Sequence, residues 1–541
     1  MKTLITGIVL LVACASCTQV ASYSGKNSDS TQSQATTQVY RDESINQSNA
    51  YSDRFLDSNS IEHFISEKHL PDSTASMLRN FYLARNYEFA WFSGDGITEQ
   101  ARSLWSLYSS VRDSSRSGDK SLEKKMDSLV QNDSLALSDA DSSLIQSELS
   151  LTGELLKYAA AHPGNGISNQ TIYYLVPAKR MDAMQLADSL LNKQKDSSAY
   201  AGNIFYSRLR SQLAHYYSIA KNGGWQAIQL PGNVIKKGNN APLISAVKKR
   251  LQATGEYMAS DTSRIFTDSL VSAIKNWQQH NGFRPDGNIS DSMIKVMNIP
   301  AEQRIRQILV NMNRSLWMQP SVEPDRIVVN IPSFMLYVYE GGTANFEMPV
   351  IVGKEGTGTV MFTGNINEIV FNPAWNLPES IVKNEIMPAL STDKSYLRKH
   401  HMEIVKANDS LPTIRQLPGK DNALGRVKFL FPNSFDIYLH DTPDKSAFAS
   451  SNRAMSHGCI RVADAEKLAV YLLRDQQEWN GQKVHAAIES GREQKVTVKA
   501  SEPVFITYYT TWVDDHGAMN FRPDVYGHDE EAENSMFEMG G

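Results

Sequence analysis

The stretch Ser456-His457-Gly458-Cys459-Ile460-Arg461-Val462 decides how the C-terminal part of the chain is interpreted, because it carries a cysteine in a histidine–glycine turn. Only two other cysteines occur among the 541 residues, and both lie near the N-terminus. A thiol attacks well only as a thiolate, so it needs a nearby base or a positive field. The sequence offers two histidines as the base, His457 and the more distant His440.

We expect His440 to be the general base of Cys459, because a histidine on a neighbouring strand approaches the thiol freely. The local turn fixes His457, which is better suited, with Ser456 and Gly458, to shape a pocket and an oxyanion hole. Backbone N–H groups, including that of Cys459, would form this hole. Gly458 removes a side chain where the backbone must approach the substrate.

Two further side chains are predicted to contact the substrate. Arg461 follows the cysteine by two positions and could hold a substrate carboxylate in a bidentate contact. Tyr438 precedes His440 by two positions on the same predicted strand.

The sequence on both sides of this stretch predicts a mainly β domain over residues 325–490. Apolar residues alternate or run together in short segments at 327–331, 334–339 and 348–353, separated by Pro-Ser and Gly-Gly turns. The whole chain is too long for one domain, so we predict an α+β multidomain protein. Residues 491–541 are predicted to be a C-terminal extension with an acidic tail.

His440 followed by Ser456-His457-Gly458-Cys459 resembles the signature of the L,D-transpeptidase catalytic-domain family. The block around Asn372-Pro373-Ala374-Trp375 and the block Gln416-Leu417-Pro418-Gly419 resemble its large, scaffold-bearing subgroup. The resemblance implies a helical lid over the site, at about residues 380–414. It also implies that a backbone carbonyl just after the base, here that of Asp441, orients the histidine; the sequence leaves open whether the Asp441 carboxylate does so instead.

The resemblance further implies the reaction. Cys459 would attack the carbonyl of the third residue of a peptidoglycan tetrapeptide stem, release D-alanine and pass its acyl group to an amine of an acceptor stem, which forms a 3→3 cross-link. No metal or organic cofactor is implied, and carbapenems are expected to react with the thiol. Water or an envelope lipoprotein remains open as the acceptor, so an L,D-carboxypeptidase is an alternative.

Two regions before residue 325 are predicted to be helical. Residues 61–235 show apolar residues at helical spacing without a catalytic constellation, which indicates a scaffold domain. Residues 241–300 predict two amphipathic helices, a Pro-Asp-Gly turn and a third short helix. This unit resembles the small three-helix peptidoglycan-binding module, and the sequence leaves open whether it binds glycan or is a spacer.

The N-terminus predicts export and membrane attachment. Residues 1–13 carry Lys2 and a short apolar run that matches a signal peptide but is too short to span a bilayer. The segment ending at Cys14 resembles a lipoprotein lipobox, so we expect Cys14 to be lipidated, with Cys17 as the alternative. Residues 14–60 are rich in Ser, Gln and Asn and are predicted to be a disordered tether, so the enzyme would face the periplasm from a membrane.

Charge and cysteine content exclude several other classes. The formal net charge of −5 gives no reason to expect nucleic-acid binding, and three cysteines cannot build a disulfide scaffold. His440, Asp441, His457 and Cys459 could in principle be zinc ligands, which is the main alternative chemistry. A non-catalytic wall-binding lipoprotein is a further alternative.

Overall fold

The computed structural model describes residues 39–111, 119–131, 142–161, 175–192, 203–317, 323–407 and 411–538. The chain separates into a short unit, Met1–Val39, and a compact unit, Tyr40–Gly541, and only the second is described below. The predicted signal peptide, Cys14 and Cys17 lie outside the described residues. Among the described helices, none is long and apolar enough to cross a membrane.

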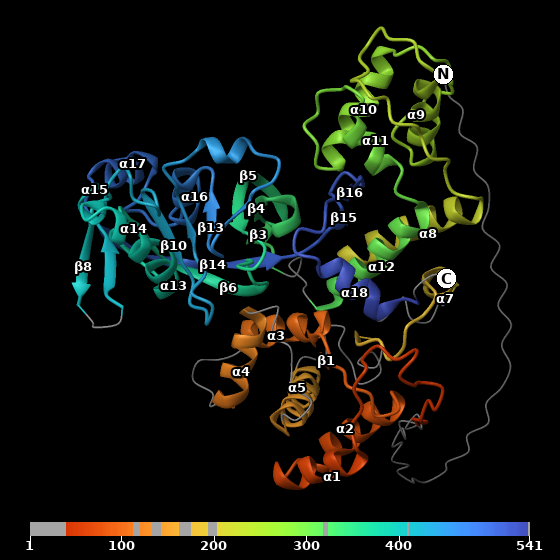
Figure 1. The fold of residues 1–541 in the computed structure, drawn as a ribbon, viewed down its shortest axis with the longest axis horizontal. Coiled ribbons are helices and arrows are strands. Elements are labelled where there is room, and N and C mark those ends of the chain that lie inside the picture. Colours follow the sequence, from red (N-terminus) through yellow and green to blue (C-terminus); the bar gives the residue numbers. More distant parts are fainter. Residues whose placement is uncertain are drawn as a thin grey trace, which may run out of the picture. The chain divides into compact units, whose positions relative to one another are not determined.

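Helices form the first part of the compact unit, as the apolar spacing predicts (Figure 1). They are α1 (Ser58–Glu67), α2 (Asp72–Ala84), α3 (Glu99–Val111), α4 (Lys120–Gln131), α5 (Ser142–Ala161), α7 (Ala183–Asn192) and α8 (Ile204–Lys221), with a small hairpin of β1 (Phe92–Ser93) and β2 (Gly96–Ile97). The buried carboxylate of Glu148 on α5 accepts hydrogen bonds from the backbone N–H groups of Ala90 and Trp91, at 2.6 and 3.0 Å. It also accepts one from the Tyr82 hydroxyl, so it joins α5 to α2 and to the approach to β1.

The predicted tether ends earlier than residue 60. Tyr51 is buried, and Leu56 is buried and forms a backbone hydrogen bond to Tyr87. The N–H of Ser52 donates to the buried Glu88 carboxylate at 2.6 Å. The scattered apolar residues of this segment therefore serve as core residues of the helical region, and the low-complexity composition around them concealed this role.

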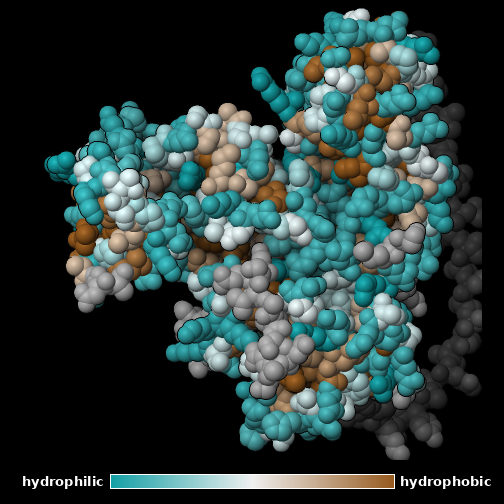
Figure 2. Space-filling view, in the orientation of Figure 1, coloured by the Kyte–Doolittle hydropathy of each residue, from teal (hydrophilic) through white to brown (hydrophobic). Residues whose placement is uncertain are grey.

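The predicted three-helix module is present. It consists of α9 (Pro242–Ala253), α10 (Asp268–His280) and α11 (Asp291–Met297), which share a hydrophobic core of their own. Thr267 and Ser290 cap α10 and α11 through their hydroxyls. Hydrophobic surface is visible on the module (Figure 2), where Met258 and Ile265 are exposed. The long helix α12 (Ala301–Trp317) follows and packs against α8.

The β domain contains a nine-stranded sheet with the order β12-β5-β13-β11-β10-β6-β14-β3-β4. Its strands are β3 (Arg326–Asn330), β4 (Met335–Glu340), β5 (Thr343–Gly353), β6 (Phe362–Phe371), β10 (Val427–Leu430), β11 (Leu439–His440), β12 (Ala454–Ser456), β13 (Ile460–Val462) and β14 (Gln494–Thr507). An additional pairing of β4 with β5 closes the sheet on itself, so the strands form a barrel. The helices α16 (Ala465–Leu472) and α17 (Gly481–Glu489) lie between β13 and β14 in the chain, and α16 contacts β14 and β10.

The boundary predicted at residue 490 is wrong. Strand β14 lies inside the sheet, antiparallel to β6 and parallel to β3, and its Val504 and Ile506 are fully buried. The segment after it is also folded. It forms the pair β15 (Thr511–Val513) and β16 (Met519–Phe521), and then α18 (His528–Met536), in which His528 and Asp529 are buried.

The predicted lid is helical only in its first half. It contains α13 (Glu379–Ile381), a π-helical turn η4 (Val382–Ile386), α14 (Met387–Thr392) and α15 (Tyr396–Lys399). A three-stranded sheet completes it, formed by β7 (Trp375–Asn376), β9 (Thr413–Gln416) and β8 (Met402–Lys406). Its small core includes Val382 and Ile414. The residues of β8 and β9 alternate as is typical of strands, and the helical prediction for 380–414 did not take this alternation into account.

Candidate active site

Three neighbouring strands bring the predicted catalytic residues together. Strand β11 pairs with β13 in parallel, with His440 opposite Arg461, and with β10 in antiparallel fashion, with His440 opposite Lys428. Directly paired residues share one face of a sheet, so these three side chains form a row across it. Cys459 lies two residues before Arg461, and the period of two places it on the same face.

The Cys459 thiol is half-buried beside this row. Its Sγ lies 3.7 Å from the carbonyl oxygen of Asp436, and the N–H of Ile460 donates to the Tyr438 carbonyl at 3.1 Å. Burial raises the pKa of the Cys459 thiol, and hydrogen bonds from Tyr438 and the charge of Lys428 oppose this increase only in part. The thiol is therefore protonated at neutral pH and needs a base to become a nucleophile.

His440 is buried and held in one tautomer. Its Nδ1 lies 2.5 Å from the Asp441 carbonyl oxygen, which can only accept, so Nδ1 carries the proton and Nε2 is left as an acceptor. Burial, and then the positive charge of Arg461, lower the pKa of His440 to about 3. The imidazole is neutral at physiological pH, which is the state that a general base requires.

The sequence left open whether the carbonyl or the carboxylate of Asp441 orients His440, and the contacts of the carboxylate decide this. The Asp441 carboxylate accepts hydrogen bonds from the Lys445 ammonium, at 2.5 Å, and from the N–H of Arg426, at 2.9 Å. It is thus engaged away from the imidazole. The carbonyl oxygen of Asp441, and not its carboxylate, orients His440.

The turn before Cys459 is fixed by local hydrogen bonds. Gly458 has a φ of 113°, which side chains rarely tolerate. The Ser456 hydroxyl donates to the Cys459 carbonyl at 2.6 Å and accepts from the N–H of Gly458 at 3.2 Å. Because Ser456 already engages the Gly458 N–H, this group does not contribute to an oxyanion hole in this conformation, contrary to the expectation that several N–H groups of the turn would do so.

His457 reaches the lid. Its Nε2 lies 3.0 Å from a carboxylate oxygen of Glu385 on the π-helical turn η4, and both side chains are partly exposed. This contact links the lid to the residue two positions before Cys459. It is consistent with the expectation that His457 is not the base.

Both predicted substrate contacts lie at the site. Within the described residues, the Nε of Arg461 is buried and has no hydrogen-bond partner. The Tyr438 ring lies 5.7 Å from the His440 ring and carries the Lys428 ammonium 3.7 Å from its centroid. Arg461 therefore offers an unused donor, and Tyr438 lines the site beside both catalytic candidates.

The sequence analysis did not identify Lys428, Thr359 and Tyr526 as residues of the site. Lys428 could have been found from the alternation of β10, which points it at the same face as His440. Thr359 donates a hydrogen bond to the Gly458 carbonyl at 2.7 Å, and Tyr526 contacts the loop that carries Thr359. Only the three-dimensional fold brings these last two to the site, because they lie far from it in the chain.

The zinc alternative does not fit this arrangement. Asp441 engages a lysine, and His457 pairs with Glu385. Among the described residues, no group of three or more His, Cys, Asp or Glu side chains is arranged to hold a metal ion.

Three family models match parts of the chain. Residues 324–506 match the L,D-transpeptidase catalytic domain. Residues 76–213 match a scaffold domain, and residues 240–297 match a family described as "Putative peptidoglycan binding domain". The match to the L,D-transpeptidase domain extends through β14, in agreement with the corrected boundary.

One curated relative is named as an L,D-transpeptidase. A protein of Haemophilus influenzae named "Putative L,D-transpeptidase" is 33% identical over 221 residues, which cover 38% of this chain and 45% of that protein. The match therefore spans just under half the length of that relative.

Solved L,D-transpeptidases are more distant. One from Mycobacterium smegmatis is 13% identical, with a TM-score of 0.19, over 34% of this chain and 58% of its own. One from Stackebrandtia nassauensis is 13% identical, with a TM-score of 0.22, over 51% and 96%. L,D-transpeptidase 3 from Mycobacterium tuberculosis, in complex with a faropenem-derived adduct, is 15% identical, with a TM-score of 0.18, over 34% and 60%. These low TM-scores carry no argument about fold or function.

Proposed function

We propose that the protein is a peptidoglycan L,D-transpeptidase in which Cys459 is the nucleophile and His440 is the general base. One observation carries this proposal. A protonated thiol lies directly before β13, and a neutral histidine whose Nε2 is left as an acceptor lies at the end of the adjacent strand β11. A cysteine and a histidine arranged in this way support acyl transfer through a thioester.

The reaction follows from these groups. His440 takes the thiol proton while the sulfur attacks the carbonyl of the third residue of a tetrapeptide stem. The carbon–nitrogen bond to the terminal D-alanine then breaks, and His440 returns the proton to the leaving amine. An amine of a second stem attacks the thioester, loses a proton to His440 and forms the 3→3 amide bond, which regenerates the thiol.

The surrounding residues have separate roles in this scheme. The Arg461 guanidinium, whose Nε has no protein partner in the described structure, binds a carboxylate of the donor stem. The N–H of Cys459 stabilises the oxyanion. The neighbouring Gly458 N–H is not available for this role, because it donates to the Ser456 hydroxyl. Tyr438 packs against the bound stem.

Mass spectrometry of muropeptides tests the proposal. The full chain with Cys14 and Cys17 replaced by serine, which leaves Cys459 as its only thiol, is incubated with tetrapeptide muropeptides. We expect loss of D-alanine and the appearance of cross-linked dimers, both abolished by Cys459→Ala. Tripeptides without dimers would instead identify water as the acceptor and the enzyme as an L,D-carboxypeptidase. Full activity of Cys459→Ala would refute the proposal.

We also propose that carbapenems acylate Cys459, since the same thiol would open their lactam ring. Incubation of the same chain with a carbapenem should increase its mass by one drug molecule, and peptide mapping should locate the adduct at Cys459. An adduct elsewhere, or none at high drug concentration, would contradict this expectation.

The membrane anchor and the glycan contact are proposals of the same kind. We propose that Cys14 is lipidated and places the enzyme on a periplasm-facing membrane surface, with Cys17 as the alternative. Mass spectrometry of the N-terminal peptide from the native protein decides between them. We propose that the module at 240–297 binds peptidoglycan, which sedimentation of the inactive Cys459→Ala chain with purified sacculi tests.

A further inference from the structure

The turn that carries Cys459 is supported by the loop at residues 353–359, which connects β5 to β6. The Thr359 hydroxyl donates to the Gly458 carbonyl at 2.7 Å and accepts from the N–H of Gly353 at 2.9 Å. The N–H of Lys354 donates to the Ser456 carbonyl at 2.9 Å. The position of the catalytic turn therefore depends on the conformation of this loop.

Tyr526 holds the loop closed from outside the sheet. Its hydroxyl donates to the Gly353 carbonyl at 2.6 Å and accepts from the N–H of Thr359 at 3.2 Å, so it bridges the two ends of the loop. Its ring lies against Gly358, where an added Cβ would be 3.3 Å from the ring. The Tyr526 hydroxyl thus adds a second bridge between Gly353 and Thr359, beside the direct bond from the Gly353 N–H to the Thr359 hydroxyl.

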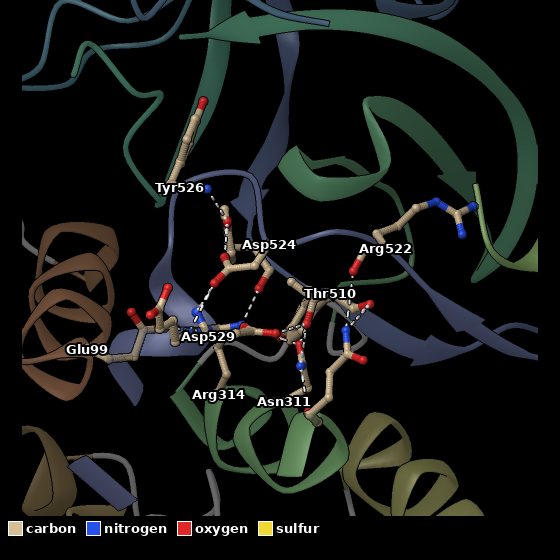
Figure 3. A network of polar contacts seen from close by, with 12 residues as sticks. Glu99, Asn311, Arg314, Thr510, Arg522, Asp524, Tyr526 and Asp529 are labelled. Atoms are coloured by element: carbon tan, nitrogen blue, oxygen red, sulfur yellow. Dashed lines mark hydrogen bonds and ion pairs between the residues drawn. The ribbon is translucent and has the colours of Figure 1, made fainter. Parts of the chain in front are cut away.

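Tyr526 is itself anchored in the segment that follows β14. Its N–H donates to the Tyr508 hydroxyl at 2.7 Å, and that hydroxyl donates to the Asp524 carboxylate at 2.5 Å. The rings of Tyr508 and Tyr526 stack with centroids 5.6 Å apart. Figure 3 shows the Tyr526 side chain pointing away from the polar cluster around Asp524 and Asp529, to which its backbone N–H is tied through the Tyr508 hydroxyl.

The same polar cluster connects the segment to the helical region. Asp529 forms a buried ion pair with Arg314 of α12, at 2.8 Å, and Arg314 forms a second one with Glu99 of α3, at 2.6 Å (Figure 3). The Thr510 hydroxyl donates a hydrogen bond to the Asp529 carboxylate and accepts one from the Asn311 amide at 2.7 Å. The backbone of Tyr526 is therefore held by elements that lie outside the catalytic sheet.

We propose that Tyr526 is a positioning residue for Cys459, acting through Thr359 and the Gly458 carbonyl. This inference rests on the proposed function and deepens it, because it makes the segment after β14 a part of the active-site support. Loss of the hydroxyl leaves the Gly353 carbonyl and the Thr359 N–H without their bridge, and the loop can then move away from the turn. A displacement of about 1 Å at a reacting atom costs on the order of 100-fold in rate.

Two substitutions and a matched control test this inference in the full chain with Cys14 and Cys17 replaced by serine. Tyr526→Phe removes the bridging hydroxyl, and Thr359→Val removes the donor to Gly458. Tyr471→Phe is the control, because the Tyr471 hydroxyl donates to the Tyr339 carbonyl at 3.2 Å, on β4 of the same sheet. Steady-state release of D-alanine and the rate of carbapenem acylation are measured for each variant.

We expect Tyr526→Phe to lower kcat and the acylation rate about 10- to 100-fold while KM changes less than threefold. Tyr471→Phe should stay within twofold of the parent chain, and Thr359→Ser should retain the rate that Thr359→Val loses. The double variant Tyr526→Phe/Thr359→Val should be no slower than its slower single variant, because both act through one contact. Multiplicative losses, or equal rates for Tyr526→Phe and Tyr471→Phe, would overturn the inference.

Alkylation of Cys459 by iodoacetamide gives a readout that does not depend on the proposed reaction. A loosened turn exposes the thiol, so Tyr526→Phe and Thr359→Val should be alkylated at least about threefold faster at pH 8, while Tyr471→Phe is unchanged. A parent chain that releases no D-alanine and forms no carbapenem adduct, but shows this alkylation pattern, refutes the proposed function and leaves the positioning role intact. An active parent chain whose variants all behave alike refutes the positioning role and leaves the proposed function intact.

Discussion

At the scale of single residues, the chemistry depends on two groups that are both uncharged at rest. Burial keeps Cys459 protonated, and burial together with Arg461 keeps His440 neutral. Cys459 and His440 therefore do not form a thiolate–imidazolium pair before a substrate is present. In the proposed reaction, the free protein holds no reactive thiolate, and proton transfer to His440 accompanies the attack on the substrate.

The low pKa of His440 predicts a pH-dependent stability. The pKa is about 3 in the folded protein and about 6.5 in the unfolded chain, so the unfolded state binds the extra proton as the pH falls through this window. The free energy of unfolding consequently falls as the pH decreases from 6.5 to 3, and at pH 5 it is about 2 kcal/mol lower than at pH 8. His440→Gln lacks this contribution, so the difference in free energy of unfolding between parent and variant should change by this amount between pH 8 and pH 5 in urea titrations. A difference independent of pH would contradict the assignment.

His440→Gln should also reduce turnover. Removal of a general base typically costs 10²–10⁴-fold, and we expect a loss in that range for D-alanine release at pH 7. Asp441→Asn is the matched control, because the carbonyl that orients His440 remains. It should retain at least about one tenth of the activity, and a loss as large as that of His440→Gln would assign the carboxylate a role in catalysis.

At the scale of elements, the predicted domain boundaries differ most from the structure. Residues 45–56 lie in a polar stretch, yet Ile45, Tyr51 and Leu56 are buried. Strand β14 follows a helix and a glycine turn that mimic a domain end, yet it lies between β6 and β3. In both segments the burial partners are distant in the chain, so local composition carries no signal of them.

The N-terminal boundary gives a prediction at this scale. Deletion of residues 1–39 should leave the stability of the compact unit unchanged, whereas deletion of residues 1–57 should lower the free energy of unfolding by at least about 3 kcal/mol. The second deletion removes Tyr51 and Leu56 from the core, at about 1.5–3 kcal/mol for each buried apolar side chain. It also takes the Ser52 N–H away from the buried Glu88 carboxylate. Equal unfolding midpoints in urea would show that the tether does extend to residue 60.

The arrangement of the candidate site was predictable because its signals are local. The turn Ser456–Cys459, the strand that ends at His440 and the alternation of Arg461 with Cys459 can be read within a few residues. The orientation of His440 by a carbonyl was expected from the family resemblance, and the competing partners of the Asp441 carboxylate, Lys445 and Arg426, decide it. Tyr526 and Thr359 could not be found in this way, because their contacts join the catalytic turn to residues that only the folded chain brings near it.

At the scale of the whole molecule, buried ion pairs join the helical region to the segment after β14. Arg314 is almost fully buried between Glu99 of α3 and Asp529 of α18, and it also donates to the Tyr508 carbonyl at 2.8 Å. Burial raises the pKa of Asp529 to about 6, and the charge of Arg314 opposes this increase. The helical scaffold and the catalytic domain therefore share one polar core.

Arg314→Ala should destabilise the protein strongly. It leaves two buried carboxylates without their partner, which typically costs 3–5 kcal/mol. Arg79→Ala is the control, because its ion pair with Glu62, at 2.7 Å, is exposed on both sides and should contribute no more than about 1 kcal/mol. The free energies of unfolding of both variants can be compared by urea titration, and equal losses would contradict the role of Arg314 as a buried link.

The central claim is that the Cys459 thiol forms the acyl-enzyme. Rapid acid quenching of the chain that has Cys459 as its only thiol, mixed with a tetrapeptide donor and no acceptor amine, allows the intact protein mass to be measured. We predict an increase equal to the donor minus D-alanine, mapped to the peptide that contains Cys459, lost on treatment with hydroxylamine and absent from Cys459→Ala. Release of D-alanine at the full rate by Cys459→Ala, or an acyl group mapped to another residue, would contradict the account.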